Sequence, residues 1–143
     1  MAHQVSGSFH WELIIKKVVI GDYFSTFRPQ VLSALIDTGT TILIMHTRDL
    51  EFFQTEVCRY VEKKLSGPSC TPFAYGYMRI EGCTSDVFET LPLFHMQLGS
   101  YMYTLNPQQY MDRLVDRDVC VFAIYGQSEK RWVLGSPFLN DYY

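Results

Sequence analysis

Apolar and polar residues alternate along two stretches of the chain. The first stretch, near the start, places apolar residues at every second position: Phe9, Trp11, Leu13 and Ile15. The second follows the Gly99-Ser100 pair and contains Tyr101, Tyr103 and Leu105. Successive side chains of a strand point to opposite faces, so alternation indicates strands with one buried face. Both stretches are predicted to be half-buried antiparallel strands.

Two other stretches are apolar without alternation, as expected for strands buried on both faces. The run from Val31 to Ile36 leads directly into Asp37, and Trp132 to Leu134 leads into Gly135. A short helical turn is predicted from Pro137 to Asp141.

A helix is predicted between Thr47 and Leu65, where apolar residues recur at helical spacing. Its apolar stripe consists of Leu50, Phe53, Val57, Tyr60, Val61 and Leu65. Gly67-Pro68 follows and is expected to stop the helix. The pattern therefore predicts an amphipathic helix that covers a β core.

Composition limits the chain to one globular domain. It has 143 residues, of which 48% are hydrophobic and 19% charged, with a net charge of -3. Its basic residues form no cluster larger than a pair, such as Lys16-Lys17 or Lys63-Lys64, which argues against nucleic acid or an anionic membrane as the partner. No apolar run is long enough to span a membrane, and no signal-peptide core follows Met1. We expect a soluble chain whose export signal, if it has one, lies outside this sequence.

Four cysteines form an even set without CxxC spacing, namely Cys58, Cys70, Cys83 and Cys120. Structural zinc sites usually have closely paired ligands, so disulfides fit better than a metal. The sequence alone permits three pairings. Disulfides would place the chain in an oxidising compartment, whereas the alternative is four reduced core cysteines in a cytosolic protein.

Asp37-Thr38-Gly39-Thr40-Thr41 is the strongest candidate for chemistry. A buried strand delivers one carboxylate into a turn, where Gly39 lets the backbone approach closely and neighbouring hydroxyls can donate hydrogen bonds. The alternative is an Asx turn in which Asp37 only caps the backbone. The triplet by itself favours neither interpretation.

The remaining candidates lack the spacing that their chemistry requires. His46 has no His-Glu-x-x-His partner and is predicted to be a helix-entry residue, while His95 is predicted to be structural. Ser136 lacks a Gly-x-Ser-x-Gly elbow, which argues against a serine hydrolase. No Gly-rich phosphate loop is present, and no cofactor or metal is expected.

The Asp37 motif and the later Val133-Leu134-Gly135-x-x-Phe-Leu-x-x-Tyr-Tyr pattern together resemble the carboxy-terminal lobe of pepsin-like aspartic proteases. The resemblance extends to residues 10–22, which look like the strand pair that opens this lobe, and to the later hairpin that begins at Leu91. Phe52 to Gly82 is the segment least like the family. The implied fold is mainly β, a single lobe over residues 1–143 with antiparallel sheets and one or two helices.

The resemblance implies a role for each motif residue. Asp37 would be one catalytic carboxylate, and Gly39, Thr40 and Thr41 would contact the extended substrate. Supporting roles fall to Thr38, Gly135 and Ser136, although relatives often have Asp at the last position. The family disulfide would join Cys83 to Cys120, which leaves Cys58 for Cys70.

The implied chemistry needs two carboxylates that share a water, and no other aspartate here precedes Thr-Gly or Ser-Gly. The sequence is therefore expected to be a lobe truncated at both ends, incomplete without an amino-terminal lobe. Two alternatives are an inactive peptide-binding pseudo-protease and a retropepsin-like homodimer of two copies. The expected substrate is a peptide or protein, and the expected location is the secretory pathway, the vacuole or lysosome, or the extracellular space.

Overall fold

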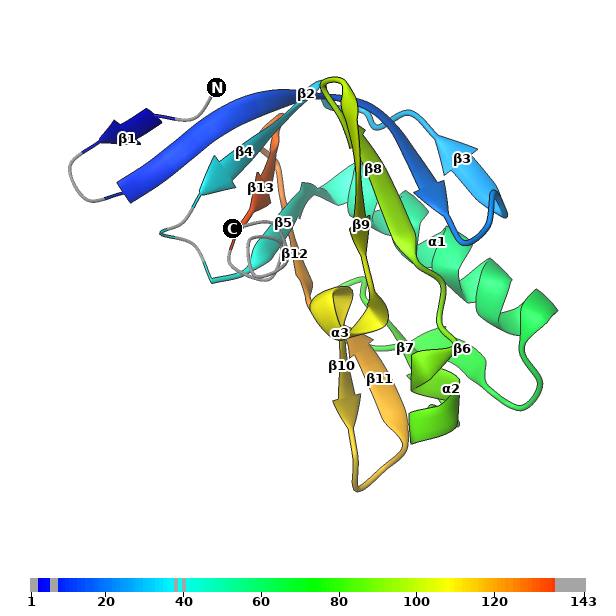
Figure 1. Ribbon diagram of the computed structural model, residues 1–143. Coiled ribbons are helices and arrows are strands. Elements are labelled where there is room, and N and C mark those ends of the chain that lie inside the picture. Colours follow the sequence, from blue (N-terminus) through cyan, green and yellow to red (C-terminus); the bar gives the residue numbers. More distant parts are fainter. Residues whose placement is uncertain (1–2, 6–7, 38, 40, 136–143) are drawn as a thin grey trace.

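The computed structural model describes residues 3–5, 8–37, 39 and 41–135 (Figure 1). The helices are α1 (Thr47–Lys64), α2 (Ser85–Glu89) and α3 (Pro107–Tyr110). The first seven strands are β1 (His3–Val5), β2 (Ser8–Ile20), β3 (Ser25–Phe27), β4 (Ser33–Asp37), β5 (Leu43–His46), β6 (Ser69–Pro72) and β7 (Met78–Glu81). The other six are β8 (Phe94–Leu98), β9 (Tyr101–Leu105), β10 (Met111–Leu114), β11 (Val119–Phe122), β12 (Ile124–Gln127) and β13 (Trp132–Leu134).

The strands form two sheets, which confirms the prediction of a mainly β lobe. The larger sheet has the order β12-β5-β13-β4-β2-β8-β9, with β1 and β3 also paired to β2. The smaller sheet has the order β10-β11-β7-β6. Most pairings are antiparallel, but β12 is parallel to β5 and β13 is parallel to β4. Three helices are present among the described residues, where one or two were expected.

The strand β2 corrects the expectation of a strand pair over residues 10–22. It is one continuous strand of 13 residues that pairs with β4 in its first half and with β8 and β3 in its second half. Its register shifts between Ile15 and Lys17, so the strand bends there and serves both halves of the sheet. Figure 1 shows this strand arching over the molecule.

The second alternating stretch, β9, pairs antiparallel to β8 as predicted. Its burial increases along the strand, from Tyr101, which is 71% exposed, to Leu105, which is buried. It lies at the edge of the large sheet, where its first residues extend beyond the core.

The predicted helix is confirmed as α1, which ends at Lys64, three residues before Gly67. His46 precedes it, and its Nδ1 accepts a hydrogen bond of 3.2 Å from the Arg48 N–H. This contact satisfies one of the unpaired donors at the helix start. His46 is therefore the helix-entry residue that the sequence predicted.

An aromatic cluster around Phe53 joins α1 to both sheets. The Phe53 ring centroid lies 4.6 Å from that of Phe94 on β8, 5.4 Å from Tyr110 on α3 and 6.0 Å from Phe122 on β11. Phe94 in turn contacts Trp132 on β13 at 6.3 Å. One core thus supports the sheets and the strand that leads to Gly135.

Both disulfides have the pairing that the family resemblance implied. Cys58–Cys70 joins α1 to β6, and Cys83–Cys120 joins the end of β7 to β11. Together they tie the smaller sheet to itself and to the helix.

A pH-dependent contact joins α1 to β3. Glu56 accepts hydrogen bonds from Arg59 at 2.8 Å and from the Ser25 hydroxyl at 2.6 Å. The hydrogen bond from Arg59 lowers the pKa of the Glu56 carboxyl, against the opposing effect of burial. A lowered pKa means that the folded state favours the ionised form, so this stability is present at neutral pH and is lost in acid.

Glu56→Gln is therefore expected to destabilise the fold at neutral pH by less than about 1 kcal/mol, because Arg59 is partly exposed. The difference should vanish as the pH falls below the ordinary glutamate pKa and through the lowered one. Urea unfolding at several pH values measures it. A difference that grew in acid would contradict the assignment.

Candidate active site

Asp37 is the last residue of β4 and lies half-buried at the end of that strand. Its Oδ1 accepts a hydrogen bond of 2.8 Å from the Gly39 N–H. A Cβ on residue 39 would lie 3.3 Å from the same oxygen, tighter than most side-chain contacts. The sequence therefore predicted correctly that a strand delivers Asp37 into a turn in which glycine permits close approach.

This contact, from the backbone of residue 39 to the side chain of residue 37, is that of an Asx turn. Both interpretations of the motif contain it, because a catalytic carboxylate also needs a fixed orientation. This hydrogen bond therefore fits both interpretations.

The strand β13 lies between β4 and β5 and brings Gly135 to this turn. It pairs parallel to β4, with Leu134 opposite Ile36. Gly135 follows Leu134 and Asp37 follows Ile36, so these two residues are neighbours across the pair. The Gly135 N–H donates a 3.1 Å hydrogen bond to the carbonyl of Ile42, which follows the turn. The second sequence motif therefore lies next to the first in space. Its Gly135 is hydrogen-bonded to the segment that follows the Asp37 turn.

Several predicted residues lie outside the described part of the chain. These are Thr38, Thr40, Ser136 and the predicted helical turn from Pro137 to Asp141. Thr41 is described and exposed. Together with Ile42 it lines a cleft, and Asp37 itself is not among the lining residues.

This cleft has a volume of about 590 Å³ and lies between the two sheets. It is lined by the turn after Asp37, the β6–β7 hairpin, α3, β10, β11 and β12. Its size falls within the range of pockets that bind small ligands or peptide side chains. The sequence reasoning missed it because its walls come from six separate segments.

The tip of the β6–β7 hairpin forms one wall of the cleft. Tyr75 and Gly76 have φ values of 57° and 81°, and the Tyr77 N–H donates to the Ala74 carbonyl at 3.1 Å, as in a type I′ turn. Buried Gln54 of α1 holds this tip by accepting from the Met78 N–H at 2.9 Å. The sequence analysis did not predict this hairpin, although the Tyr75-Gly76 pair is a signal that could have indicated its turn.

The buried side chain of Asp49 connects the elements that carry the Asp37 turn. Asp49 of α1 is 2% exposed. Its Oδ1 accepts from the Gln30 N–H at 2.7 Å, and its Oδ2 accepts from Trp132 Nε1 at 2.9 Å. One side chain thus links the helix to the segment before β4 and to β13, the two strands that end beside the Asp37 turn.

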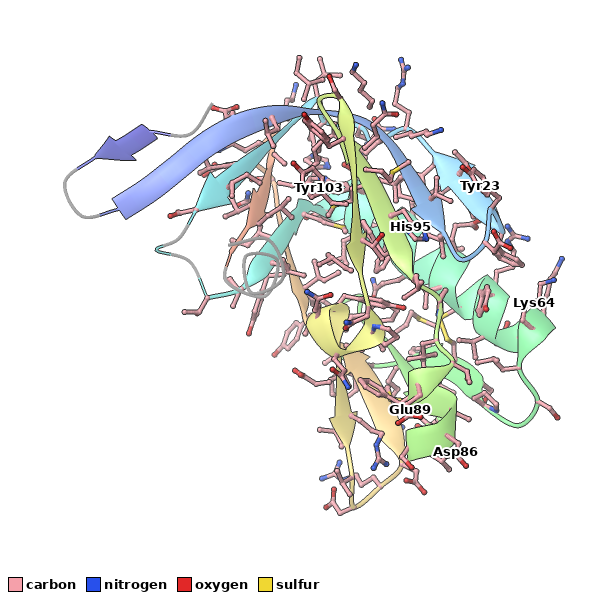
Figure 2. The ribbon with its side chains drawn as sticks, in the orientation of Figure 1. Tyr23, Lys64, Asp86, Glu89, His95 and Tyr103 are labelled. Atoms are coloured by element: carbon pink, nitrogen blue, oxygen red, sulfur yellow. A yellow bond between two sulfur atoms is a disulfide. The ribbon has the colours of Figure 1, made fainter. Side chains whose placement is uncertain are left out.

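The other histidine of interest, His95, lies on β8 away from the Asp37 turn (Figure 2). Its Nδ1 makes a 2.8 Å hydrogen bond with the Thr104 hydroxyl of β9, in agreement with a structural role. Within the described residues, no cluster of His, Cys, Asp or Glu is suited to a metal ion. No described helix is long and apolar enough to cross a membrane.

Comparisons with known proteins bear on the meaning of this turn. The family model for eukaryotic aspartyl proteases matches residues 1–143. A probable aspartic-type endopeptidase (CTSD) of Arthroderma otae is 21% identical, gastricsin of Oryctolagus cuniculus 27% and plasmepsin IV of Plasmodium falciparum 30%. These alignments cover 97%, 97% and 85% of this chain but only 33%, 33% and 25% of the relatives.

A mainly β lobe whose strand end presents an Asp-Thr-Gly turn defines the class as an acid-protease lobe. The chain belongs to the eukaryotic aspartyl protease family. It spans about a third of the length of the first two curated relatives that it matches.

Proposed function

We propose that this chain supplies one catalytic carboxylate, Asp37, to an aspartic endopeptidase. The observation that carries the proposal is the position of Asp37 at the end of β4, oriented by Gly39 and followed by Thr41 and Ile42, which line a cleft, in a chain of this family. An Asx turn with no further role would need neither the cleft nor the Gly135 contact to Ile42.

The reaction needs a second carboxylate, which an amino-terminal lobe or a second copy of the chain would supply. One carboxylate takes a proton from a shared water while the other, protonated, polarises the peptide carbonyl. Asp37 fills one of these roles. In this proposal Gly39, Thr40 and Thr41 bind the substrate backbone, and Thr38, Gly135 and Ser136 have supporting roles.

The two disulfides support an oxidising compartment, because cytosolic thiols are kept reduced. We therefore place the protein in the secretory pathway, a vacuole or lysosome, or the extracellular space. The substrate in that setting is a peptide or protein.

The monomeric chain is expected to have no peptidase activity, because one carboxylate cannot both remove and donate the protons. The purified monomer, verified by light scattering, is assayed against denatured haemoglobin from acidic to neutral pH. The same assay is run on the chain preceded by an amino-terminal aspartic-protease lobe, which should cleave in a pepstatin-sensitive manner. Pepstatin-sensitive turnover by the monomer would contradict the proposal.

The two alternatives give different results in the same assay. A retropepsin-like homodimer would show activity that rises with the square of the chain concentration at low concentration and that an excess of inactive Asp37→Asn chain suppresses. A pseudo-protease would bind peptide but stay inactive in every form.

A further inference from the structure

The cleft between the sheets has one aromatic wall and one charged residue. The hairpin contributes Phe73, Tyr75 and Tyr77, of which Tyr75 is 98% exposed at the tip. The opposite side comes from β10 to β12, where the smaller sheet runs on into the edge of the larger one (Figure 1). Among all the lining residues, only Asp112 carries a formal charge.

Asp112 lies on the face of the smaller sheet that borders the cleft. It is directly opposite Val121 of β11, which also lines the cleft, and Val121 is opposite Arg79 of β7. Arg79 does not neutralise Asp112, because its Nε makes a 2.6 Å ion pair with Glu81. Within the described residues, the side chain of Asp112 makes no hydrogen bond or ion pair.

The hairpin already holds one cation against an aromatic ring. The guanidinium carbon of Arg79 lies 5.7 Å from the ring centroid of Phe73. Attraction of this kind between a cation and an aromatic face contributes about 0.5 to 1 kcal/mol at exposed sites. Tyr75 and Tyr77 offer further rings on the same wall.

We infer that this cleft binds an arginine or lysine side chain of an extended peptide, a specificity site that rests on the proposed endopeptidase function. The aliphatic stem of such a side chain packs against the aromatic wall, and its cationic end reaches the carboxylate of Asp112. An acidic side chain is disfavoured, because it would meet Asp112, and Arg79 beside Phe73 is already paired with Glu81.

Binding of short blocked peptides to the full 143-residue chain tests this inference without any cleavage. Three dye-labelled peptides differ at one position, which is Arg, norleucine or Glu, and their affinities are measured by fluorescence anisotropy and by NMR shifts of labelled chain. The Arg peptide is expected to bind about fivefold more tightly than the norleucine peptide, the effect of one partly exposed ion pair. The Glu peptide is expected to bind most weakly.

Asp112→Asn is expected to remove the preference for Arg over norleucine and to leave norleucine binding unchanged. Asp116→Asn makes the same change of charge in the exposed β10–β11 turn, outside the cleft, and should keep the preference. Tyr75→Ala should weaken the binding of both the Arg and the norleucine peptide, because it removes part of the aromatic wall that they contact. Both Asn variants change exposed side chains, so their folding is checked by circular dichroism.

Equal affinity for the Arg and norleucine peptides would overturn the inference, as would a preference that survives Asp112→Asn or the absence of binding by any peptide. None of these results depends on catalysis. Failure of cleavage in the two-lobe assay, with Arg preference intact, would instead count against the proposed endopeptidase and leave a peptide-binding lobe.

Discussion

Asp37→Asn should abolish peptide hydrolysis by a two-lobe enzyme that contains this chain, with a loss of at least several hundredfold in kcat. The amide oxygen can still accept the hydrogen bond from the Gly39 N–H, so the turn should keep its shape. An amide cannot exchange a proton with the shared water, and positioned proton transfer contributes about 10²- to 10⁴-fold to rate. The variant should therefore keep the fold of the parent and lose its rate of hydrolysis.

The measurement compares kcat and the thermal midpoint of the variant with those of the parent. Asp22→Asn is the matched control, since Asp22 is an exposed acid in the turn after β2, at the opposite end of that strand from His10, which pairs with Asp37. The control should retain full activity. If Asp37→Asn folded normally and kept most of its activity, Asp37 would be a turn residue only.

Asp49→Ala should cost about 2 to 4 kcal/mol of folding free energy, a large fraction of the stability of a domain this size. Removal of the carboxylate leaves two donors without their partner, the buried Trp132 Nε1 and the Gln30 N–H, whose hydrogen bond is part-buried. Each such donor carries an unpaired-group penalty of about 1 to 3 kcal/mol. Urea unfolding of the isolated chain measures the loss.

Two further variants distinguish the loss of the Asp49 hydrogen bonds from the general effect of an alanine substitution in α1. Glu51→Ala, an exposed position on the same helix, should change stability by less than about 0.5 kcal/mol. In a Trp132→Phe background, Asp49→Ala should cost less than in the parent, because one donor is already gone. A cost for Asp49→Ala below about 1 kcal/mol in the parent would contradict a stabilising network.

The sequence was informative wherever the physical signal is local. Helical spacing and a Gly-Pro stop predicted the helix as α1 within one residue of its end, because a helix is formed by contacts three and four residues apart. The same holds for β9, for β13 and for the strand that carries Asp37 into its turn. The order of two motifs, together with the residues between them, was enough to indicate the family.

The long strand β2 shows where local signals fail. The family resemblance implied a pair of strands over residues 10–22, yet one strand passes from β4 to β8 across a register shift. The alternation of apolar and polar residues does not indicate which strand will pair with which, because the side-chain period is the same for every pairing.

By itself, the sequence determined the strand-to-turn placement of Asp37, the helix and the aspartyl protease resemblance. Only the tertiary structure decided that β13 inserts between β4 and β5, that Asp49 reaches Trp132 across 83 residues, and that Asp112 faces an aromatic wall from another hairpin. Contacts between distant residues form because buried apolar faces and polar groups must find partners in three dimensions. Such partners leave no fixed spacing in the sequence.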